Sequence, residues 1–336
     1  MSIRPLFRAW LCVPIFCCAQ THDVSSPPSS PPKSKAAAHA ESPARTLSRA
    51  WIRDALQIDD LAKRNAAIES IRNGLQSHDP VANHAGLIAL SAIGEVKYDK
   101  QPFRALVLPY LKSSDGAVRA AAMYALYNTV HEPADLDRIL AMVDDPSAEV
   151  QSSITHAIFL FSGGEVTGKA GDAVAKLLAG EDTRRLREAL RGIWGAHLSP
   201  EAEQRVLELA HSADPELRHA AIYFGLSTLQ PKSEAVVDEL VKTLADPVAE
   251  NAERALWGLG HGVPEPLEPR VADAMLRLLS ARSSARIDES TLRLIGMYGT
   301  RDHAARLREI VASANATDSQ RAAANRALAE IERRQK

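Results

Sequence analysis

A short sequence pattern recurs through most of this 336-residue chain, at intervals of about thirty-three residues. In each copy an apolar helical segment ends at an aspartate, and an alanine-rich segment follows. The clearest of these aspartates are Asp79, Asp115, Asp145, Asp214 and Asp246, and weaker copies begin near Asp182, at Ile287–Asp288 and at Asp318. Spacings between the clear copies are 36, 30, 69 (two copies) and 32 residues. Such self-similarity predicts an elongated stack of helical hairpins.

The aspartate at each break has a local physical role. An Asp side chain at a helix N-cap accepts hydrogen bonds from the first amide groups, and a proline at the next position, as in Asp214-Pro215, loses nothing because that amide has no helical partner. Alanine pairs such as Ala220-Ala221 follow and allow neighbouring helices to approach closely. In the leading segments, for example 236–244, apolar residues recur at helical spacing.

Composition favours the same fold class. Aromatic residues make up only 5% of the chain while alanine is abundant, which argues against a β-sandwich or barrel. We therefore expect an all-α protein, an α-α superhelix of about eight helical-hairpin repeats over residues 47–336. The charged last segment, 321–334, has the character of a capping repeat, and one elongated, monomeric domain is expected.

The pattern Asp-Pro-x-x-Val/Leu-Arg-x-Ala-Ala-x-x-Ala-Leu…Gly resembles HEAT repeats, most closely the compact bacterial kind called phycobilisome-lyase-type HEAT-like repeats. The resemblance covers residues 47–334, whereas the Trp/Leu-Gly/Tyr spacing of TPR repeats is absent. It implies an armadillo-like solenoid that binds a protein partner on its concave face. HEAT-like iron hydroxylases use several His-Glu pairs, but only His131-Glu132 occurs here, so that metal role is not carried over.

The first eighteen residues predict a targeting segment. Arg4 and Arg8 precede a short apolar run, and all three cysteines of the chain, Cys12, Cys17 and Cys18, lie in this stretch. Ile15-Phe16-Cys17-Cys18 resembles a bacterial lipobox in which Cys18 would be lipidated, although Phe16 and Cys17 depart from the usual small residues. Residues 1–18 are thus expected to be a signal peptide, and the protein to lie in the cell envelope, periplasmic or lipid-anchored.

Two alternatives to lipidation stay open. A signal peptidase could cut after Ala19 and release the chain, or the apolar start could be accidental and the protein cytoplasmic. Residues 19–46, rich in Pro and Ser, have no apolar period and predict a disordered tether that could extend roughly 90 Å.

The residue pattern offers little for chemistry. Gly163–Ala170 nearly matches a phosphate-binding loop, but Ala170 replaces the hydroxyl residue that would hold Mg²⁺, and a helix rather than a strand is expected before it. The eleven histidines form no metal-binding spacing, and no cysteine follows residue 18. A net charge of −2 gives no general attraction to nucleic acid. We expect no catalytic residue, metal or cofactor; the alternative is a cytosolic, lyase-type HEAT-like enzyme or enzyme partner.

Aromatic residues recur at one place in the repeats. Tyr127, Phe159, Trp194 and Trp257 each directly follow the small or apolar pair of a second helix. At 100° per residue, Trp257 lies roughly 150° from the centre of its helix's core face. We therefore expect these four residues to project from the concave face and anchor a peptide or helix, with polar contacts from Arg119, Arg218 and Arg254. The expected function is that of a scaffold or adaptor without catalysis.

Overall fold

The computed structural model describes residues 42–57, 59–94, 96–130, 132–281, 285–314 and 316–334. The predicted signal peptide, the lipidation site Cys18 and residues 19–41 of the predicted tether lie outside this range. The chain divides into two compact units, one within residues 1–132 (unit 1) and one within 133–336 (unit 2), and each is described by itself.

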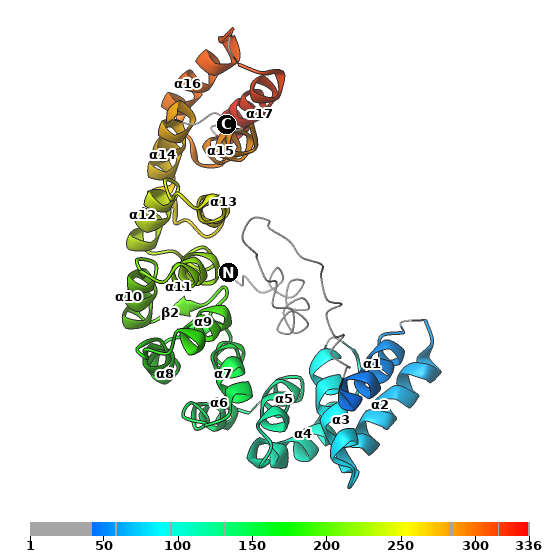
Figure 1. The fold of residues 1–336 in the computed structure, drawn as a ribbon. Helices are drawn as coiled ribbons and strands as arrows, with labels where there is room; N and C mark the ends of the chain where they lie inside the picture. The colour runs from blue at the N-terminus through cyan, green and yellow to red at the C-terminus, as the bar shows by residue number, and fades with distance from the viewer. Residues whose placement is uncertain are drawn as a thin grey trace, which may run out of the picture. The chain divides into compact units, whose positions relative to one another are not determined.

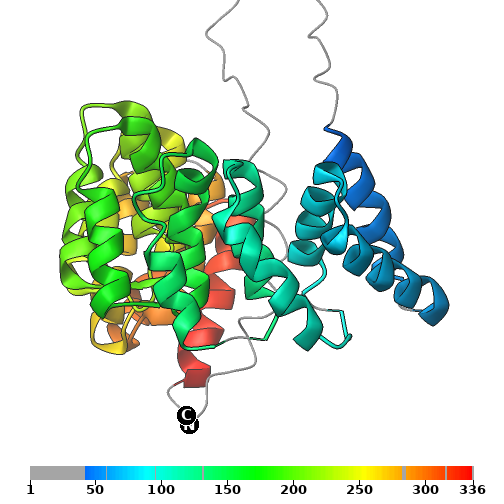
Figure 2. The same cartoon turned by 90° about the horizontal axis from the view of Figure 1, so that it is seen from below.

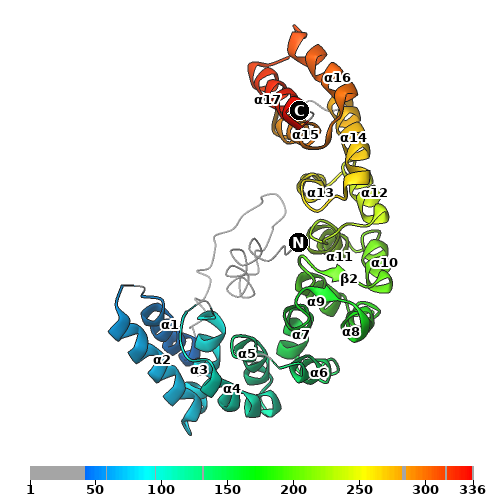
Figure 3. The same ribbon diagram turned by 180° about the vertical axis from the view of Figure 1, so that it is seen from behind.

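Unit 1 consists of two rows of helices. Its elements are α1 (Pro43–Ala55), α2 (Leu61–Gln76), α3 (Pro80–Ala92), α4 (Gln101–Val107), which continues into the 3₁₀ segment η3 (Leu108–Lys112), and α5 (Gly116–Tyr127). The helices α1, α3 and α5 pack side by side, and α2 and α4 pack against them (Figure 3). Helix α1 begins at Pro43, inside the segment 19–46 that the sequence assigned to the tether.

Unit 2 continues the alternation. Its elements are α6 (Ala134–Leu140), α7 (Ala148–Phe161), β1 (Glu165–Val166), α8 (Gly168–Leu178), α9 (Thr183–Gly192), β2 (His197–Leu198), α10 (Pro200–Leu209), α11 (Pro215–Ala220), the π-helical segment η4 (Ala221–Leu226), α12 (Glu234–Thr243), α13 (Ala249–Leu259), the 3₁₀ segment η5 (Glu265–Leu267), α14 (Glu268–Ala281), α15 (Ala285–Tyr298), α16 (Arg301–Ala312) and α17 (Asp318–Arg334).

The helices of unit 2 form two rows, several of them seen nearly end-on in Figure 1 and from the side in Figure 2. We call α7, α9, α11 with η4, α13, α15 and α17 the second-helix row, and α6, α8, α10, α12, α14 and α16 the first-helix row. Neighbours within the second-helix row contact one another throughout. This row lies on the inner side of the curve of unit 2 (Figure 1).

Together the described helices form eight hairpins, preceded by α1: α2–α3, α4–α5, α6–α7, α8–α9, α10–α11, α12–α13, α14–α15 and α16–α17. The predicted all-α superhelix of helical-hairpin repeats is thereby confirmed as the fold class. Stacking is required because one hairpin has too little apolar surface to form a core of its own. Each repeat instead buries its apolar face against the next, as Ile158, Leu190 and Leu256 do, all at least 94% buried.

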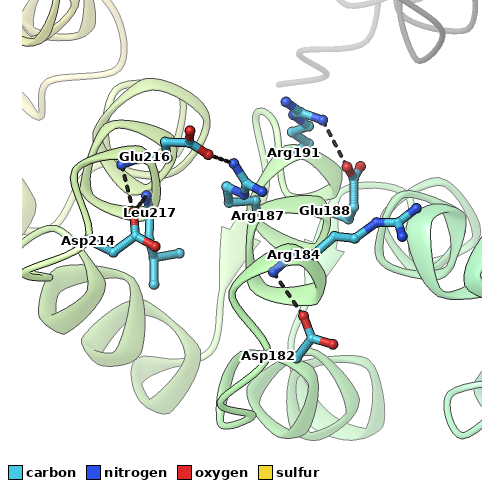
Figure 4. Close-up of polar contacts among 8 residues, drawn as sticks. All are labelled: Asp182, Arg184, Arg187, Glu188, Arg191, Asp214, Glu216 and Leu217. Carbon is cyan, nitrogen blue, oxygen red and sulfur yellow. Dashed lines mark hydrogen bonds and ion pairs between the residues drawn. The ribbon is translucent and has the colours of Figure 1, made fainter. Parts of the chain in front are cut away.

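The aspartate breaks behave as expected at four of the hairpins. Asp79, Asp115, Asp182 and Asp214 are N-caps whose carboxylates accept backbone N–H groups of the following turn. Asp214, for example, accepts from Glu216 at 2.9 Å and from Leu217 at 3.2 Å (Figure 4). These bonds satisfy amide groups that have no partner inside the helix.

Two other Asp-Pro pairs end differently. Ser147, not Asp145, caps α7, and α13 begins at Ala249 after Val248, which has no side-chain cap. Asp145 and Asp246 each accept the backbone N–H two residues onward, at 2.9 and 2.7 Å. The short Asp side chain here stabilises a turn before the helix rather than its first turn.

Loops that follow the second-helix row are tied to one another by backbone hydrogen bonds. The strands β1 and β2 pair in parallel, with Glu165 opposite His197. The amide of Gln230 donates to the Ala196 carbonyl at 3.2 Å, and the amide of Lys232 donates to the Gly262 carbonyl at 3.1 Å. These bonds join segments about one repeat apart, so they fix the spacing of the loops beside the second-helix row of unit 2.

The segment that resembles a phosphate-binding loop belongs to this system. It follows helix α7, as the sequence predicted, and leads through Gly163 and Gly164, whose φ angles are 68° and 89°, into β1. Lys169, the residue that would meet a phosphate, pairs instead with Asp137 at 3.3 Å. The loop has a structural role in the stacking of repeats.

Candidate binding site

Five side chains from three successive repeats meet on the second-helix row of unit 2. They are Trp194, in the turn after α9, Tyr223 and Phe224, in η4, and Arg254 and Trp257, in α13. We call this group the aromatic–arginine cluster. Three of its members, Trp194, Trp257 and Arg254, were predicted from the sequence as partner-binding residues.

The aromatic rings of the cluster are in edge and tilted contact. Trp194 lies 6.2 Å from Trp257 and 6.3 Å from Phe224, and Phe224 lies 4.8 Å from Tyr223, measured between ring centroids. Separations in this range are favourable for aromatic pairs because the positive edge of one ring faces the negative face of another. The rings therefore form one continuous patch rather than isolated surface residues.

Arg254 occupies the centre of the patch. The guanidinium carbon lies 3.9 Å from the ring centroid of Trp257, 4.0 Å from that of Tyr223 and 4.8 Å from that of Trp194. Its Nε donates to the backbone carbonyl of Tyr223 at 3.0 Å, which fixes the plane of the group. Cation–π attraction of this kind strengthens where the cation is removed from water.

The charge of Arg254 has no counter-ion in the described part of the chain: no carboxylate lies within 4.0 Å. Its Nη2 is buried and makes no hydrogen bond there either. Burial lowers the pKa of Arg254 from its ordinary value, because desolvation disfavours the charged form. A half-buried cation is thus held in place by rings and a carbonyl and not by an acid.

Exposure differs among the members of the cluster. The side chain of Trp194 is 41% exposed and is the one aromatic residue among the large hydrophobic side chains that the described residues leave exposed. Tyr223, Phe224, Arg254 and Trp257 are half-buried. An amphipathic ring at the surface, backed by packed rings, is the arrangement typical of an interface anchor.

A second cation lies under the loop beside the cluster. Lys232 is 1% exposed, and its Nζ donates to the carbonyls of Leu229 at 3.0 Å and His261 at 2.7 Å. Burial, together with the charge of Arg254, lowers the pKa of Lys232 to about 8. The His261 ring also lies against Trp257 in a tilted arrangement, with 4.4 Å between ring centroids.

The cluster has one further cation at its edge. Arg191 lies over the ring of Phe224, 5.4 Å from its centroid, and pairs with Glu188 at 2.9 Å (Figure 4). On the same helix, Arg187 pairs with Glu216 of α11 (Figure 4). The charges of Arg187 and Arg191 are therefore each paired with a carboxylate, whereas that of Arg254 is not.

Four other predicted residues do not join the cluster. Phe159 stacks on His156 within α7, with 6.2 Å between ring centroids. Tyr127 and Arg119 belong to α5 of unit 1, and Arg218 belongs to α11. Phe159 and Tyr127 are half-buried. Their part in partner binding remains a prediction.

Arg119 and Arg218 share a local role. Arg119 donates to the carbonyls of Ser113 and Ser114 at 2.7 and 3.1 Å, and Arg218 donates to the carbonyl of Ser212 at 3.1 Å. Each side chain thus reaches back from the first turn of its helix to the loop before it. These bonds satisfy carbonyl groups of the loop, which have no partner inside a helix.

Tyr223 and Phe224 were missed by the sequence analysis. The same signal was available, because Tyr223 directly follows the apolar pair Ala221-Ile222. Phe224 had no such signal. The π-helical hydrogen bond from the Ser227 amide to the Ile222 carbonyl, 3.1 Å, widens this turn, and both neighbouring rings contact the cluster.

Charged residues pair with one another in a groove on another part of unit 2. A shallow groove of about 300 Å³ beside α7 and α9 is lined by Asp144, Lys176, Asp182 and Arg185 among others. Lys176 pairs with Asp144 at 2.7 Å and Arg185 with Asp182 at 3.7 Å.

Within the residues that the structure describes, which exclude His131, no three His, Cys, Asp or Glu side chains are grouped as metal ligands. No helix there is long and apolar enough to cross a bilayer.

No protein-family model matches the chain, and no curated protein matches its sequence. Solved structures that are similar to it include Kap121p, at 10% identity and a TM-score of 0.37 over 86% of this chain and 41% of that one. Human deoxyhypusine hydroxylase is similar at 19% identity and a TM-score of 0.28, over 76% of this chain and 96% of that one. An engineered protein gives 16% identity and a TM-score of 0.21, over 86% and 97%.

The chain spans less than half the length of Kap121p. At these TM-scores, the fold assignment depends on the hairpins of the structure itself, and any function depends on the cluster. What the observations establish is a helical-repeat protein with one aromatic–arginine cluster, assembled from three repeats.

Proposed function

We propose that this protein is a scaffold or adaptor that binds a protein partner through the second-helix row of unit 2, with the aromatic–arginine cluster as the anchor. The observation that carries the proposal is the position of Trp194, 41% exposed, over the packed rings of Phe224 and Trp257. Tryptophan, tyrosine and arginine are the residue types that dominate binding energy at protein interfaces.

The physical reason is that the surface is prepared in advance. The rings are held by mutual contact and the guanidinium by the Tyr223 carbonyl, so little side-chain freedom is lost when a partner covers them. A patch of aromatic surface also releases water when it is covered. In keeping with this, the cluster presents rings and one cation, whereas a catalytic site needs titratable groups that converge on a reacting atom.

We further propose that the protein is exported, acts as a monomer and is held in the cell envelope by a lipid on Cys18. Export and lipid attachment rest on the sequence alone, on Arg4 and Arg8, the short apolar run and the lipobox-like Ile15–Cys18. The intact mass of the N-terminus, measured on native protein from fractionated cells, tests it. A chain that begins at acylated Cys18 supports the proposal. An unprocessed Met1 in the cytosol would replace it with the cytosolic alternative, an enzyme or enzyme partner.

The binding surface is tested by photo-crosslinking in the native cell. A benzophenone amino acid placed at Phe224 lies within the cluster, and the matched control places it at Gln204, exposed on α10 in the first-helix row. We expect a protein adduct from position 224 and none from 204. The adduct should disappear when Trp194 and Trp257 are both replaced by alanine. Equal adducts at the two positions, or an adduct that survives the double replacement, would contradict the proposal.

A further inference from the structure

We infer that the aromatic–arginine cluster recognises a carboxylate: the partner segment that it binds carries a Glu or Asp side chain for Arg254, next to an apolar or aromatic residue for Trp194. This inference rests on the proposed function and specifies the chemistry of the partner. It follows from three features of the cluster, which are its unpaired charge, the arrangement of the guanidinium and the exposure of the Trp194 ring.

The unpaired charge is the first feature. Arg254 and Lys232 have no carboxylate of the described residues within 4.0 Å, and the hydrogen bonds that they make go to three backbone carbonyls, of Tyr223, Leu229 and His261. Two cations that are partly or fully removed from water, with only neutral acceptors, produce a positive potential at the surface above them. An anionic group is the complement of that potential.

The arrangement of the guanidinium is the second feature. The rings of Tyr223, Trp257 and Trp194 pack around Arg254, and its Nε is already used by the Tyr223 carbonyl. The two terminal nitrogens, Nη1 and Nη2, make no hydrogen bond to the described residues, and of the two only Nη2 is buried. The N–H groups of Nη1 are therefore the donors left for a carboxylate oxygen, in a charge-assisted hydrogen bond.

These contacts also exclude a cationic ligand. Three rings around a cation would otherwise be typical of a cage for a trimethylated lysine or a choline group. Here the chain's own guanidinium, 3.9 to 4.8 Å from the ring centroids, takes that place. A second cation would meet Arg254 itself, and like charges repel at this distance.

The exposed ring is the third feature. Trp194 covers one side of Arg254 and is itself 41% exposed, so a side chain next to the bound carboxylate would lie on apolar surface. The neighbouring cations Arg191 and Arg187 already pair with Glu188 and Glu216, so they do not compete for the partner's acid. Arg254 is therefore the residue that distinguishes an acidic from a neutral partner.

The test uses two libraries of N-acetylated, C-amidated hexapeptides that are identical except at one fixed position, which is Glu in one and Gln in the other, followed by an equimolar mixture of Phe, Trp and Leu. Binding is followed by the indole N–H signals of ¹⁵N-tryptophan-labelled full-length protein. Trp194 and Trp257 report on the cluster, and Trp51, in α1 of unit 1, is the internal reference.

We expect the Glu library to shift the Trp194 and Trp257 signals at a concentration at least about tenfold lower than the Gln library, because the hydrogen bond is charge-assisted. In the Arg254→Met variant the difference should fall below about twofold, since the apolar stem stays but the charge is lost. Arg187→Met, which removes a cation of the same row that is already paired, should keep the preference. If Arg254→Met proves unstable, Arg254→Lys takes its place in the test. Because this variant keeps the charge, it should keep part of the preference for the Glu library.

The two hypotheses fail in different ways. Equal shifts with both libraries would overturn the carboxylate inference and leave the aromatic binding surface intact. Shifts of Trp51 equal to those of the cluster, or no shift of Trp194 and Trp257 with either library, would contradict both the carboxylate inference and the aromatic binding surface. A Glu preference that persists in Arg254→Met would also overturn the inference, because another cation would then be responsible.

Discussion

Replacing Lys232 by methionine should change how the stability of unit 2 depends on pH. The Lys232 side chain is 1% exposed and its pKa is lowered to about 8 from 10.5, chiefly by burial and further by the charge of Arg254. Between these two values the unfolded chain binds a proton that the folded chain does not, so stability must rise with pH across this window. Below pH 8 both states carry the proton and the full cost of the buried charge is present.

The magnitude follows from the same two values. A difference of one pKa unit corresponds to about 1.4 kcal/mol, and the linkage relation gives a gain of about 2 kcal/mol in the free energy of unfolding between pH 7 and pH 9.5. The Lys232→Met variant has no ionisable group there and lacks this gain. Other groups that titrate in this range are common to both proteins and cancel in the difference. The wild-type protein should therefore gain about 2 kcal/mol relative to the variant.

The assay is urea unfolding at several pH values, followed by tryptophan fluorescence, since Trp194 and Trp257 lie in the same unit as Lys232. The matched control is Lys176→Met on α8, where the side chain is 62% exposed and pairs with Asp144. A difference for Lys232→Met that changes with pH no more than the Lys176→Met difference does would refute the reasoning, because the lysine would then not be desolvated in the folded state.

Three further predictions concern stability. Gly192→Ala should destabilise the protein by about 1–3 kcal/mol, since a Cβ there would lie 2.6 Å from both the His156 amide nitrogen and the Thr155 Cβ. The control is Gly180→Ala, where the atom nearest to the added Cβ is 3.7 Å away. Equal urea midpoints for the two variants would contradict the close packing at Gly192. Burial lowers the pKa of His156 to about 4 from 6.5, so the folded protein loses about 2 kcal/mol of stability as the pH falls from 7 to 5. His156→Gln should remove this loss of stability in acid. The difference between thermal melts of the two proteins at the two pH values measures it. Asp214→Ala should cost about 1 kcal/mol of stability through loss of the α11 N-cap. Hydrogen exchange of the Glu216 and Leu217 amides, which donate to the Asp214 carboxylate, should become faster. Unchanged exchange would argue against the cap.

The position of the cluster within three repeats has a consequence for specificity. Trp194, Tyr223 and Arg254 belong to successive hairpins, so the arrangement of the guanidinium and the rings depends on the stacking of α9, η4 and α13. The Gly258 backbone lies so close to Ser227 that a Cβ would come within 2.8 Å of the Ser227 Cα. Close packing of this kind holds α13 at a fixed spacing from η4, which a preformed binding surface requires.

Much of the fold could be predicted from short stretches of sequence. The N-caps at Asp79, Asp115 and Asp214 depend on a carboxylate and amides two or three residues onward, and such local effects are readable from the chain. The hairpins could be predicted from the helical spacing of apolar residues for the same reason. Where two local structures compete, as at Asp145 and Asp246, the sequence could not decide between a helix cap and a turn before the helix.

The site was predictable only as a set of outward-pointing residues. Helical angle alone placed Trp257 away from the core of its helix, and the structure brings this ring to 6.2 Å from Trp194. That Arg254 lies among the rings without an acid, and that Lys232 is buried against the His261 carbonyl, depends on contacts between residues 29 to 60 positions apart. The stacking of repeats decides such contacts, because local propensity acts over a few residues. The sequence therefore determined the hairpins and the face, and the tertiary structure decided which side chains form the cluster.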